Sequence, residues 1–279
     1  MCVYFKIFGL QFPAYGSMIA LGLVIASTLG VLVIGKKHGI NPYDFLIMEA
    51  YCLLFGILGA KILYFIVSFK YIDWHRFFHD GEYFTLLMNG GFVFYGGLIF
   101  GAVGALVGSK IHKISLKEFA LHGLFMVPMI HAFGRVGCFL AGCCYGIPYD
   151  GPIAVIFPEN EIGGGAPAGI PLFPVQLVES VCLLVISLIM IAIDRKGKNA
   201  PTVSFYLIAY AIVRFTLENY RYDSIRGSFK GFSTSQWISM GLIIFGILML
   251  FVQYGFRKKK QKAIMMPEEN QNDKVEENK

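Results

Sequence analysis

Long apolar runs, separated by short polar or turn-rich segments, occupy most of the chain. A helix that crosses the hydrocarbon core of a bilayer needs about 20 mostly apolar residues. The stretches that qualify lie at about residues 14–35, 44–69, 91–109, 118–138, 174–193, 201–220 and 234–256. Because apolar and polar positions do not alternate within them, the pattern disfavours a β-barrel. The sequence therefore predicts an all-α integral membrane protein with seven transmembrane helices.

Lysine and arginine gather in the segments at one end of these helices. They are Lys36, Lys37, Lys110, Lys113, Lys117, Arg195, Lys196, Lys198, Arg257, Lys258, Lys259, Lys260 and Lys262. Since short cytoplasmic segments carry an excess of basic residues, we expect the N-terminus outside and the C-terminus in the cytoplasm, which an odd number of helices requires. The two longest loops, about 70–90 and 139–173, then face outward. Residues 1–262 are predicted to form the transmembrane domain, and residues 263–279 a polar, disordered cytoplasmic tail.

Composition supports the same class. Of 279 residues, 56% are hydrophobic and only 15% are charged, and the mean hydropathy is +0.62. A soluble domain carries about 25% charged residues, so the charged share is too low to cover a globule of this length. A soluble enzyme, a disordered chain and a nucleic-acid-binding domain are excluded. The net charge of +6 does not change this, because the surplus is sorted to one side of the membrane.

Several ionisable residues lie inside the predicted spans, where a charge is costly. They are Glu49, Lys61, His122, His131, Arg135, Glu179, Arg214 and Glu218. Such groups either pair and tie helices together, snorkel to the interface, or serve a function. Arg135, Arg214 and Glu218 are expected to converge at the outer end, and Arg214 and Glu218, four apart, share a helix face. A guanidinium at the outer interface suits a lipid phosphate, because its planar fork donates two parallel hydrogen bonds.

The segment from His131 to Gly146 (HAFGRVGCFLAGCCYG) combines Arg135 with closely spaced glycines. Glycine lets backbones approach closely and lets a helix break near the interface. A broken helix exposes backbone N–H groups beside the cation, which together make an anion site. By itself, this segment predicts a polar pocket at the outer leaflet.

The same segment resembles the signature of the bacterial prolipoprotein diacylglyceryl transferases, Gly-Arg-x-Gly-Asn-Phe followed by Asn-x-Glu and Gly. Here it reads Gly134-Arg135-Val136-Gly137-Cys138-Phe139, then Ala141-Gly142-Cys143 and Gly146. Further similar stretches follow in collinear order: Ala14–Met18, Gly59–Tyr64, Phe94–Leu98, Pro174–Glu179, Arg214–Asp223 and Gln236–Gly241. From about residue 10 to 255, the chain is identified as a member of this family, and the family's seven-helix arrangement with the N-terminus outside agrees.

The resemblance implies an activity. A member of this family transfers the diacylglyceryl group of phosphatidylglycerol to the thiol of a lipobox cysteine, which forms a thioether and releases glycerol phosphate. The implied partners are phosphatidylglycerol and prolipoprotein signal peptides, at the outer leaflet of the bacterial inner (plasma) membrane. We expect no nucleic acid, no metal and no soluble cofactor, and we expect the multi-pass chain to act as a monomer.

Site residues are carried over by the same resemblance. The catalytic set is Tyr95, Arg135, Arg214 and Glu218, with both arginines on the lipid phosphate and Glu218 orienting Arg214. The substrate-binding set is Arg135, Tyr15, Gly137, Cys138, Gly146 and Gln176.

Three positions depart from the family pattern: Tyr95 stands for a histidine, Cys138 for an asparagine and Cys143 for a glutamate. Histidine is a natural general base near neutral pH, whereas a tyrosine, with a pKa of about 10, needs a neighbouring arginine to lower it. Either Tyr95 acts as a phenolate, another group is the base, or the reaction differs. The alternative function is a divergent paralogue that binds anionic phospholipid without this transfer, or a lipid transferase with another acceptor at Cys138 or Cys143.

Cys138, Cys143 and Cys144 cluster at the outward end of the fourth predicted span. They fill tight helix packing, form a disulfide from Cys138 in an oxidising exterior, act as a reactive thiol, or bind zinc with His131. Cys-x4-Cys-Cys is not a usual zinc-ligand spacing. Cys52 and Cys182, within spans, are expected to be small core residues.

His75 and His79 are four apart in the first outer loop, beside Trp74, Phe77 and Phe78. On a helix the two histidines would share a face with metal-ligand spacing, but no third ligand is evident. The segment instead predicts an amphipathic stretch on the membrane surface.

Overall fold

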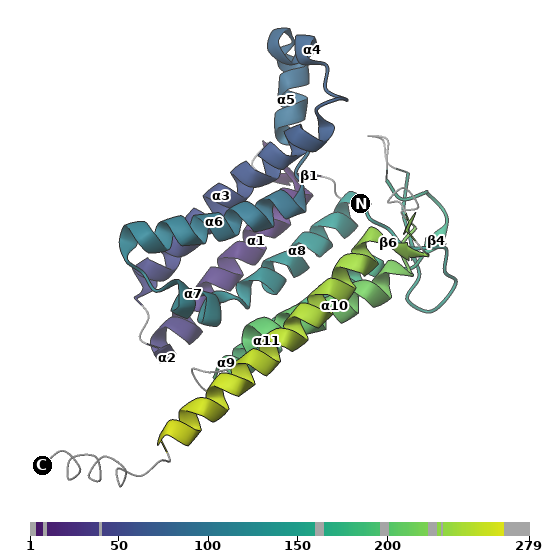
Figure 1. Ribbon diagram of the computed structural model, residues 1–279. Coiled ribbons are helices and arrows are strands. Elements are labelled where there is room, and N and C mark those ends of the chain that lie inside the picture. Colours follow the sequence, from purple (N-terminus) through teal and green to yellow (C-terminus); the bar gives the residue numbers. More distant parts are fainter. Residues whose placement is uncertain are drawn as a thin grey trace, which may run out of the picture. The chain divides into compact units, whose positions relative to one another are not determined.

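The computed structural model describes residues 4–7, 10–38, 41–159, 165–195, 201–222, 228–229 and 231–264, and it is mainly helical (Figure 1). The helices are α1 (Ala14–Leu29), the π-helical η1 (Gly30–Gly35), α2 (Lys36–His38), α3 (Pro42–Ser68), α4 (Trp74–His79), α5 (Gly81–Asn89), α6 (Phe94–His112), α7 (Leu116–Gly123), α8 (Met126–Ala141), α9 (Val175–Asp194), α10 (Thr202–Glu218) and α11 (Thr234–Ile264). Three antiparallel pairs join β1 (Tyr4–Ile7) to β2 (Leu10–Pro13), β3 (Val155–Ile156) to β4 (Pro171–Leu172), and β5 (Ser228–Phe229) to β6 (Phe232–Ser233).

Several helices are long and apolar enough to cross a membrane. Within the described residues these are Ala14–Leu32, Pro42–Ser68, Val175–Asp194 and Thr234–Val252, and α7 with α8 gives a fifth if the two count as one broken span. The prediction of an all-α membrane protein is therefore confirmed. Each of the predicted spans contains a helix, and the first outer loop contains α4 and α5. Residues 160–164, Asp223 and the tail beyond Ile264 lie outside the described residues.

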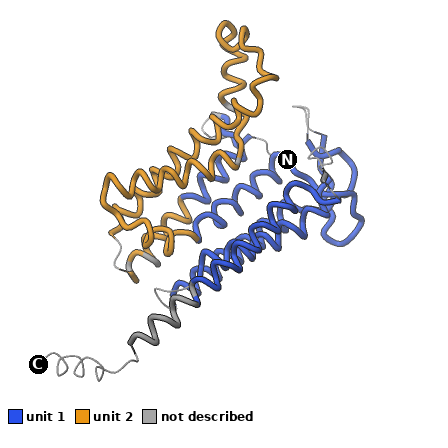
Figure 2. Tube along the Cα trace, in the orientation of Figure 1, with its two compact units in different colours: residues 1–23, 125–279 blue, residues 24–124 orange. Residues whose placement is uncertain are grey.

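The chain divides into two compact units (Figure 2). Unit 1 comprises residues 1–23 and 125–279, and unit 2 comprises residues 24–124. The boundary between residues 23 and 24 falls within α1, and the boundary between residues 124 and 125 falls between α7 and α8.

In unit 2, α3 and α6 pack side by side through glycine (Figure 1). The glycines that α6 presents are Gly96, Gly97, Gly101, Gly104 and Gly108. A methyl group at Gly96 would overlap the carbonyl oxygen of Gly59, and one at Gly104 would overlap that of Tyr51. Lipid tails are as apolar as leucine, so helices in a bilayer associate by close van der Waals packing, which small residues permit. This glycine interface therefore holds the two helices together.

Lys61, one of the charges within the predicted spans, has a structural role in unit 2. Its ammonium group donates to the carbonyl oxygens of Leu87, at 2.7 Å, and Gly90, and it lies 4.3 Å from the ring centre of Phe92. The last carbonyls of a helix lack partners within that helix, so Lys61 caps α5. The backbone N–H of Val93 also donates to the carbonyl oxygen of Ala60, at 3.1 Å. These bonds fix the segment that leads into α6.

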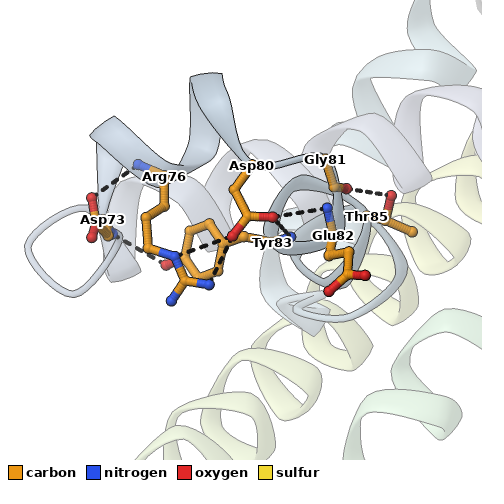
Figure 3. A network of polar contacts seen from close by, with 7 residues as sticks. All are labelled: Asp73, Arg76, Asp80, Gly81, Glu82, Tyr83 and Thr85. Atoms are coloured by element: carbon orange, nitrogen blue, oxygen red, sulfur yellow. Dashed lines mark hydrogen bonds and ion pairs between the residues drawn. The ribbon is translucent and has the colours of Figure 1, made fainter.

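The short helices of the outer loop share one polar network (Figure 3). Asp73 caps α4 by accepting from the backbone N–H of Arg76, at 3.1 Å, and Asp80 caps α5 by accepting from the N–H groups of Glu82 and Tyr83. The Arg76 guanidinium donates to Asp80 at 2.8 Å, and this hydrogen bond lowers the pKa of Asp80. Carboxylates at helix N-termini satisfy backbone donors that have no other partner, so the loop organises itself locally.

His75 and His79 lie on α4 as the spacing predicts. Their rings stack with centroids 4.5 Å apart, and the Nδ1 atom of His79 is 2.8 Å from the carbonyl oxygen of His75. Among the described residues, neither histidine belongs to a group of three potential metal ligands.

In unit 1, a ladder of polar contacts joins α8 to α9. The hydroxyl of Ser187 donates to the carbonyl oxygen of Phe125, and that of Ser180 donates to the carbonyl oxygen of Ala132, each at 2.9 Å. Both serines are buried on the face of α9 that carries Gln176 and Glu179. Hydrogen bonds between helices of this kind stabilise membrane bundles and set their register.

We expect Gly104→Ala to lower the free energy of unfolding by about 1–3 kcal/mol, the usual cost of overpacking. The added methyl group would overlap the backbone carbonyl of Tyr51, which can only yield by separating α3 from α6. Thermal unfolding in detergent measures the change. Gly241→Ala in α11 is the matched control, because a methyl group there meets no atom within 4 Å. Equal effects of the two substitutions would contradict the glycine interface.

Candidate active site

Three helices of unit 1 each bring one charged side chain to a common cluster. Arg135 on α8 and Arg214 on α10 have side chains only 13% and 9% exposed, and the side chain of Glu179 on α9 is fully buried. Nη2 of Arg135 lies 3.0 Å from Oε1 of Glu179. Glu179 also interacts electrostatically with Arg214. The Glu179 carboxylate therefore serves as a counter-charge for both arginines.

The predicted pairing of Arg214 with Glu218 is confirmed. Nη2 of Arg214 lies 2.6 Å from Oε2 of Glu218, one helical turn further along α10. The same guanidinium donates to the hydroxyl of Ser235 on α11, at 3.0 Å. A side chain held from two sides loses most of its rotamer freedom, so Arg214 is oriented before any ligand arrives.

Each arginine keeps donor capacity. Among the described residues, Nε of Arg135 and Nη1 of Arg214 are buried and have no hydrogen-bond partner. A buried donor without a partner costs about 1–3 kcal/mol, and more if it is charged. An anionic oxygen beside such a donor would satisfy it, and a guanidinium binds such an oxygen with short, strong hydrogen bonds. The cluster is thus chemically suited to a phosphate.

The glycine-rich segment ends α8 as the sequence predicts. Gly142 adopts a left-handed conformation, with φ of 72°. The N–H of Gly142 then donates to the carbonyl oxygen of Phe139, and the N–H of Cys143 to that of Cys138, each at 3.1 Å. This pattern is a Schellman motif, which satisfies the last carbonyls of a helix and reverses the chain. The side-chain amide of Gln176 donates to the carbonyl oxygen of Cys143, at 2.8 Å, and holds the reversed segment.

Gly137 and Gly146 are sites of close backbone approach. A methyl group at Gly137 would lie 2.9 Å from the Cα atom of Tyr15, and one at Gly146 would lie 2.8 Å from the carbonyl oxygen of Tyr220 and would overlap that of Phe173. The backbone N–H of Ile147 donates to the carbonyl oxygen of Tyr220, at 3.0 Å. The chain after α8 is therefore clamped between two other segments of unit 1.

The predicted residues of unit 1 come together. Tyr15, which is 47% exposed, interacts electrostatically with Arg135 and with Cys138, Cys143 and Cys144. Tyr95 belongs to unit 2, on the first turn of α6. It is 46% exposed.

The cysteines differ from the expectation in part. Five cysteines lie within the described residues, and all five are free thiols. Cys52 and Cys182 are only half-buried, so the expectation that they belong to the core is wrong. Cys52 lies on α3 and Cys182 on α9, and each helix leaves its cysteine partly exposed. A small apolar thiol can face lipid as well as protein. Cys138 is buried, while Cys143 and Cys144 are half-buried.

The catalytic and binding residues predicted from the sequence do not include three residues that the structure places in the cluster. Glu179 was visible as a charge within a span, but its pairing with Arg135 was not. Tyr210 interacts electrostatically with Arg135 and Arg214, and its ring meets that of His131 with centroids 5.5 Å apart. Its position four residues before Arg214 was the available signal.

Arg221, a third omitted residue, interacts electrostatically with Arg214 and with Cys144. Its signal was its place three residues after Glu218, just beyond the predicted span.

The comparison with known families assigns the chain to one of them. The family described as prolipoprotein diacylglyceryl transferase matches residues 2–252, a range that includes both units. The chain belongs to this family. Membership of this family explains why one chain carries both the buried arginines and glycines of unit 1 and the Tyr95 segment of unit 2. In a prolipoprotein diacylglyceryl transferase, the cluster around Glu179 is the natural candidate for the active site.

Individual relatives agree. The chain is 38% identical over 245 residues to phosphatidylglycerol–prolipoprotein diacylglyceryl transferase 2 of Clostridium perfringens, which is 88% of this chain and 92% of that protein. It is 36% identical over 257 residues to the Clostridium tetani enzyme, with 92% and 98% covered. It is 30% identical over 262 residues to the Streptococcus pneumoniae enzyme, with 92% and 94% covered. The Clostridium tetani and Streptococcus pneumoniae relatives both carry the name phosphatidylglycerol–prolipoprotein diacylglyceryl transferase.

Glu179→Gln should lower the free energy of unfolding by about 3–5 kcal/mol, because loss of one partner leaves a buried charge uncompensated. The substitution preserves volume, so the effect reports the loss of the negative charge of Glu179 that faces Arg135. Chemical unfolding in detergent measures it, with Glu159→Gln, at an exposed position of the same unit, as the control. Wild-type stability of Glu179→Gln would show that Glu179 is not the counter-charge.

Proposed function

We propose that this protein transfers the diacylglyceryl group of phosphatidylglycerol to the lipobox cysteine thiol of a prolipoprotein, forms a thioether and releases glycerol phosphate. Family membership and the names of the relatives support the activity. The observation that carries the assignment to a site is the pair of largely buried arginines that share Glu179 and retain unpartnered donors.

The charges of the cluster match the substrate. The guanidinium groups of Arg135, Arg214 and Arg221, against the carboxylates of Glu179 and Glu218, leave one net positive charge. A phosphodiester carries one negative charge, so the lipid phosphate would neutralise the cluster. Oriented donors in a site of low dielectric stabilise developing charge better than water does. Arg135 and Arg214 hold the phosphate, and Glu218 positions Arg214.

The bond changes follow from the products. The thiolate sulfur attacks the carbon of the diacylated glycerol that bears the phosphate. A carbon–sulfur bond forms there, and the bond from that carbon to the phosphate oxygen breaks. The electron pair leaves on the phosphate oxygen, where the arginine N–H groups receive the growing charge. The thiol, with a pKa of about 8.5, must first lose its proton. We assign the role of general base to Tyr95.

The remaining residues shape the site. Gln176 holds the carbonyl of Cys143, and Gly146 lets the following segment pass between two backbones. Gly137, two residues after Arg135, brings Tyr15 against α8. With Cys138 in the last turn of α8, these positions line the entrance for lipid and signal peptide.

The topology of the proposal has seven spans, with the N-terminus outside and the C-terminus in the cytoplasm of a bacterial cell. Helices in every predicted stretch and the sorting of basic residues support it. The site then faces the outer leaflet of the plasma membrane, and a monomer suffices because all named residues belong to one chain.

Arg135→Ala is expected to reduce transfer about 10²–10³-fold, as loss of one preorganised donor does in other enzymes. The assay follows label from phosphatidylglycerol to a lipobox peptide with purified protein in lipid. Arg195→Ala is the control, because Arg195 is an exposed arginine at the C-terminal end of α9. If wild-type protein bound phosphatidylglycerol but never transferred it, the proposed activity would fail and the lipid-binding alternative would hold.

Tyr95→Phe is expected to slow transfer about 10²–10⁴-fold, the usual contribution of general base catalysis. Tyr95→His should retain activity and shift the pH–rate profile to lower pH, because histidine has a pKa of about 6.5. Tyr71→Phe, at a tyrosine that is 88% exposed in the outer loop, is the matched control. An unchanged pH profile in Tyr95→His would remove Tyr95 from the role of base.

A further inference from the structure

Three thiols meet at the end of α8. The sulfur atoms of Cys138, Cys143 and Cys144 all lie within 4.8 Å of one another. The Cys143 thiol also donates to the carbonyl oxygen of Cys138, at 3.6 Å. Cys138 is buried in the last turn of the helix, and the others are half-buried in the segment that follows. The cluster is therefore packed on one side and accessible on the other.

The backbone is arranged to bring the third sulfur into place. The turn at Gly142 reverses the chain over the end of α8, and Cys144 follows with φ of 57°. A left-handed conformation is uncommon for a residue with a side chain, and such outliers gather at functional sites. The hydrogen bonds from Gln176 to Cys143 and from Tyr222 to Tyr145, at 2.8 and 3.3 Å, hold both sides of Cys144. The surrounding structure thus enforces the unusual conformation.

The chemistry of the cluster is that of a soft metal site. Zinc binds thiolate sulfur at about 2.3 Å in tetrahedral geometry, so that neighbouring sulfurs are about 3.8 Å apart. Small side-chain rotations bring sulfurs that already lie within 4.8 Å to that separation. Thiolate ligands select soft ions such as Zn²⁺ over Mg²⁺ or Ca²⁺. Three thiolates with Zn²⁺ carry one negative charge, and two positively charged groups, Arg221 and Arg135, interact electrostatically with Cys144.

We propose that Cys138, Cys143 and Cys144 together bind one Zn²⁺ ion as thiolates, with a fourth coordination position open to water or to a ligand. Binding converts three thiols to thiolates and releases their protons to solvent. His131, which the sequence suggested as a fourth ligand, is not part of the group that meets here. The proposal differs from the metal-free protein that the sequence predicts. The proposal does not depend on transferase activity.

The test uses the full chain in detergent, reduced with a phosphine and freed of metal. Titration with Zn²⁺ alone should reach one ion per chain, and Co²⁺ in its place should give thiolate-to-cobalt charge-transfer absorption. Cys143→Ser and Cys144→Ser should each weaken binding more than about 100-fold, because even outer-shell partners of a metal contribute 10–100-fold. Both positions are half-buried, so these variants tolerate the change better than Cys138→Ser.

Cys182→Ser is the matched control, because it removes a half-buried thiol of the same unit that is outside the cluster. It should leave the stoichiometry and the charge-transfer band unchanged. Counting alkylated thiols by mass spectrometry should show three cysteines protected when Zn²⁺ is bound.

Three outcomes overturn the proposal: no stoichiometric Zn²⁺ in the reduced wild type, binding that persists in both serine variants, or, in protein purified and alkylated without any reductant, two thiols that resist alkylation until a reductant is added. The last would identify a disulfide instead. None of these readouts involves lipid or peptide, so failure of the metal site and failure of the transfer reaction are distinguishable.

Discussion

A guanidinium in a membrane-spanning helix needs a counter-charge, and the structure of unit 1 depends on how that need is met. Arg135 and Glu179 lie 3.0 Å apart, and the carboxylate is fully buried. Removing either partner would leave an uncompensated charge in a medium that tolerates it poorly. The pair therefore fixes the register of α9 against α8, and the serine contacts at Ala132 and Phe125 continue that register along the helices. Because Glu179 also interacts with Arg214, the same charge draws α10 to the cluster.

Close backbone approach is the second constraint, and it appears wherever glycine meets a carbonyl. In unit 2 it joins α6 to α3 at Gly104 and its neighbours. In unit 1 it sets Tyr15 against Gly137 and passes Gly146 between two other segments. Lipid supplies no hydrophobic drive for helix association, so contact area and hydrogen bonds must do so. The glycines of the motif thus build the walls of the site, while the arginines supply its charge.

Two of the three departures from the family pattern described above lie at the end of α8. Sulfur replaces the amide and carboxyl oxygens of the family's signature at Cys138 and Cys143, and Cys144 adds a third thiol. Arg135 lies one turn earlier on the same helix, so the phosphate-binding cation and the thiol cluster share one rigid element. The substitution changes the chemistry of the entrance without disturbing the ion pair that positions the helix.

The sequence by itself determined everything that depends on short spacing or on run length. Apolar runs established the membrane class, the four-residue spacing paired Arg214 with Glu218, and glycine marked the end of α8. Collinear motifs established the family. Only the tertiary structure decided that Glu179 faces Arg135, because two helices distant in sequence can meet in many registers. It also decided that three sulfurs meet, since their separation depends on the left-handed turn and on the packing of α9 beneath it.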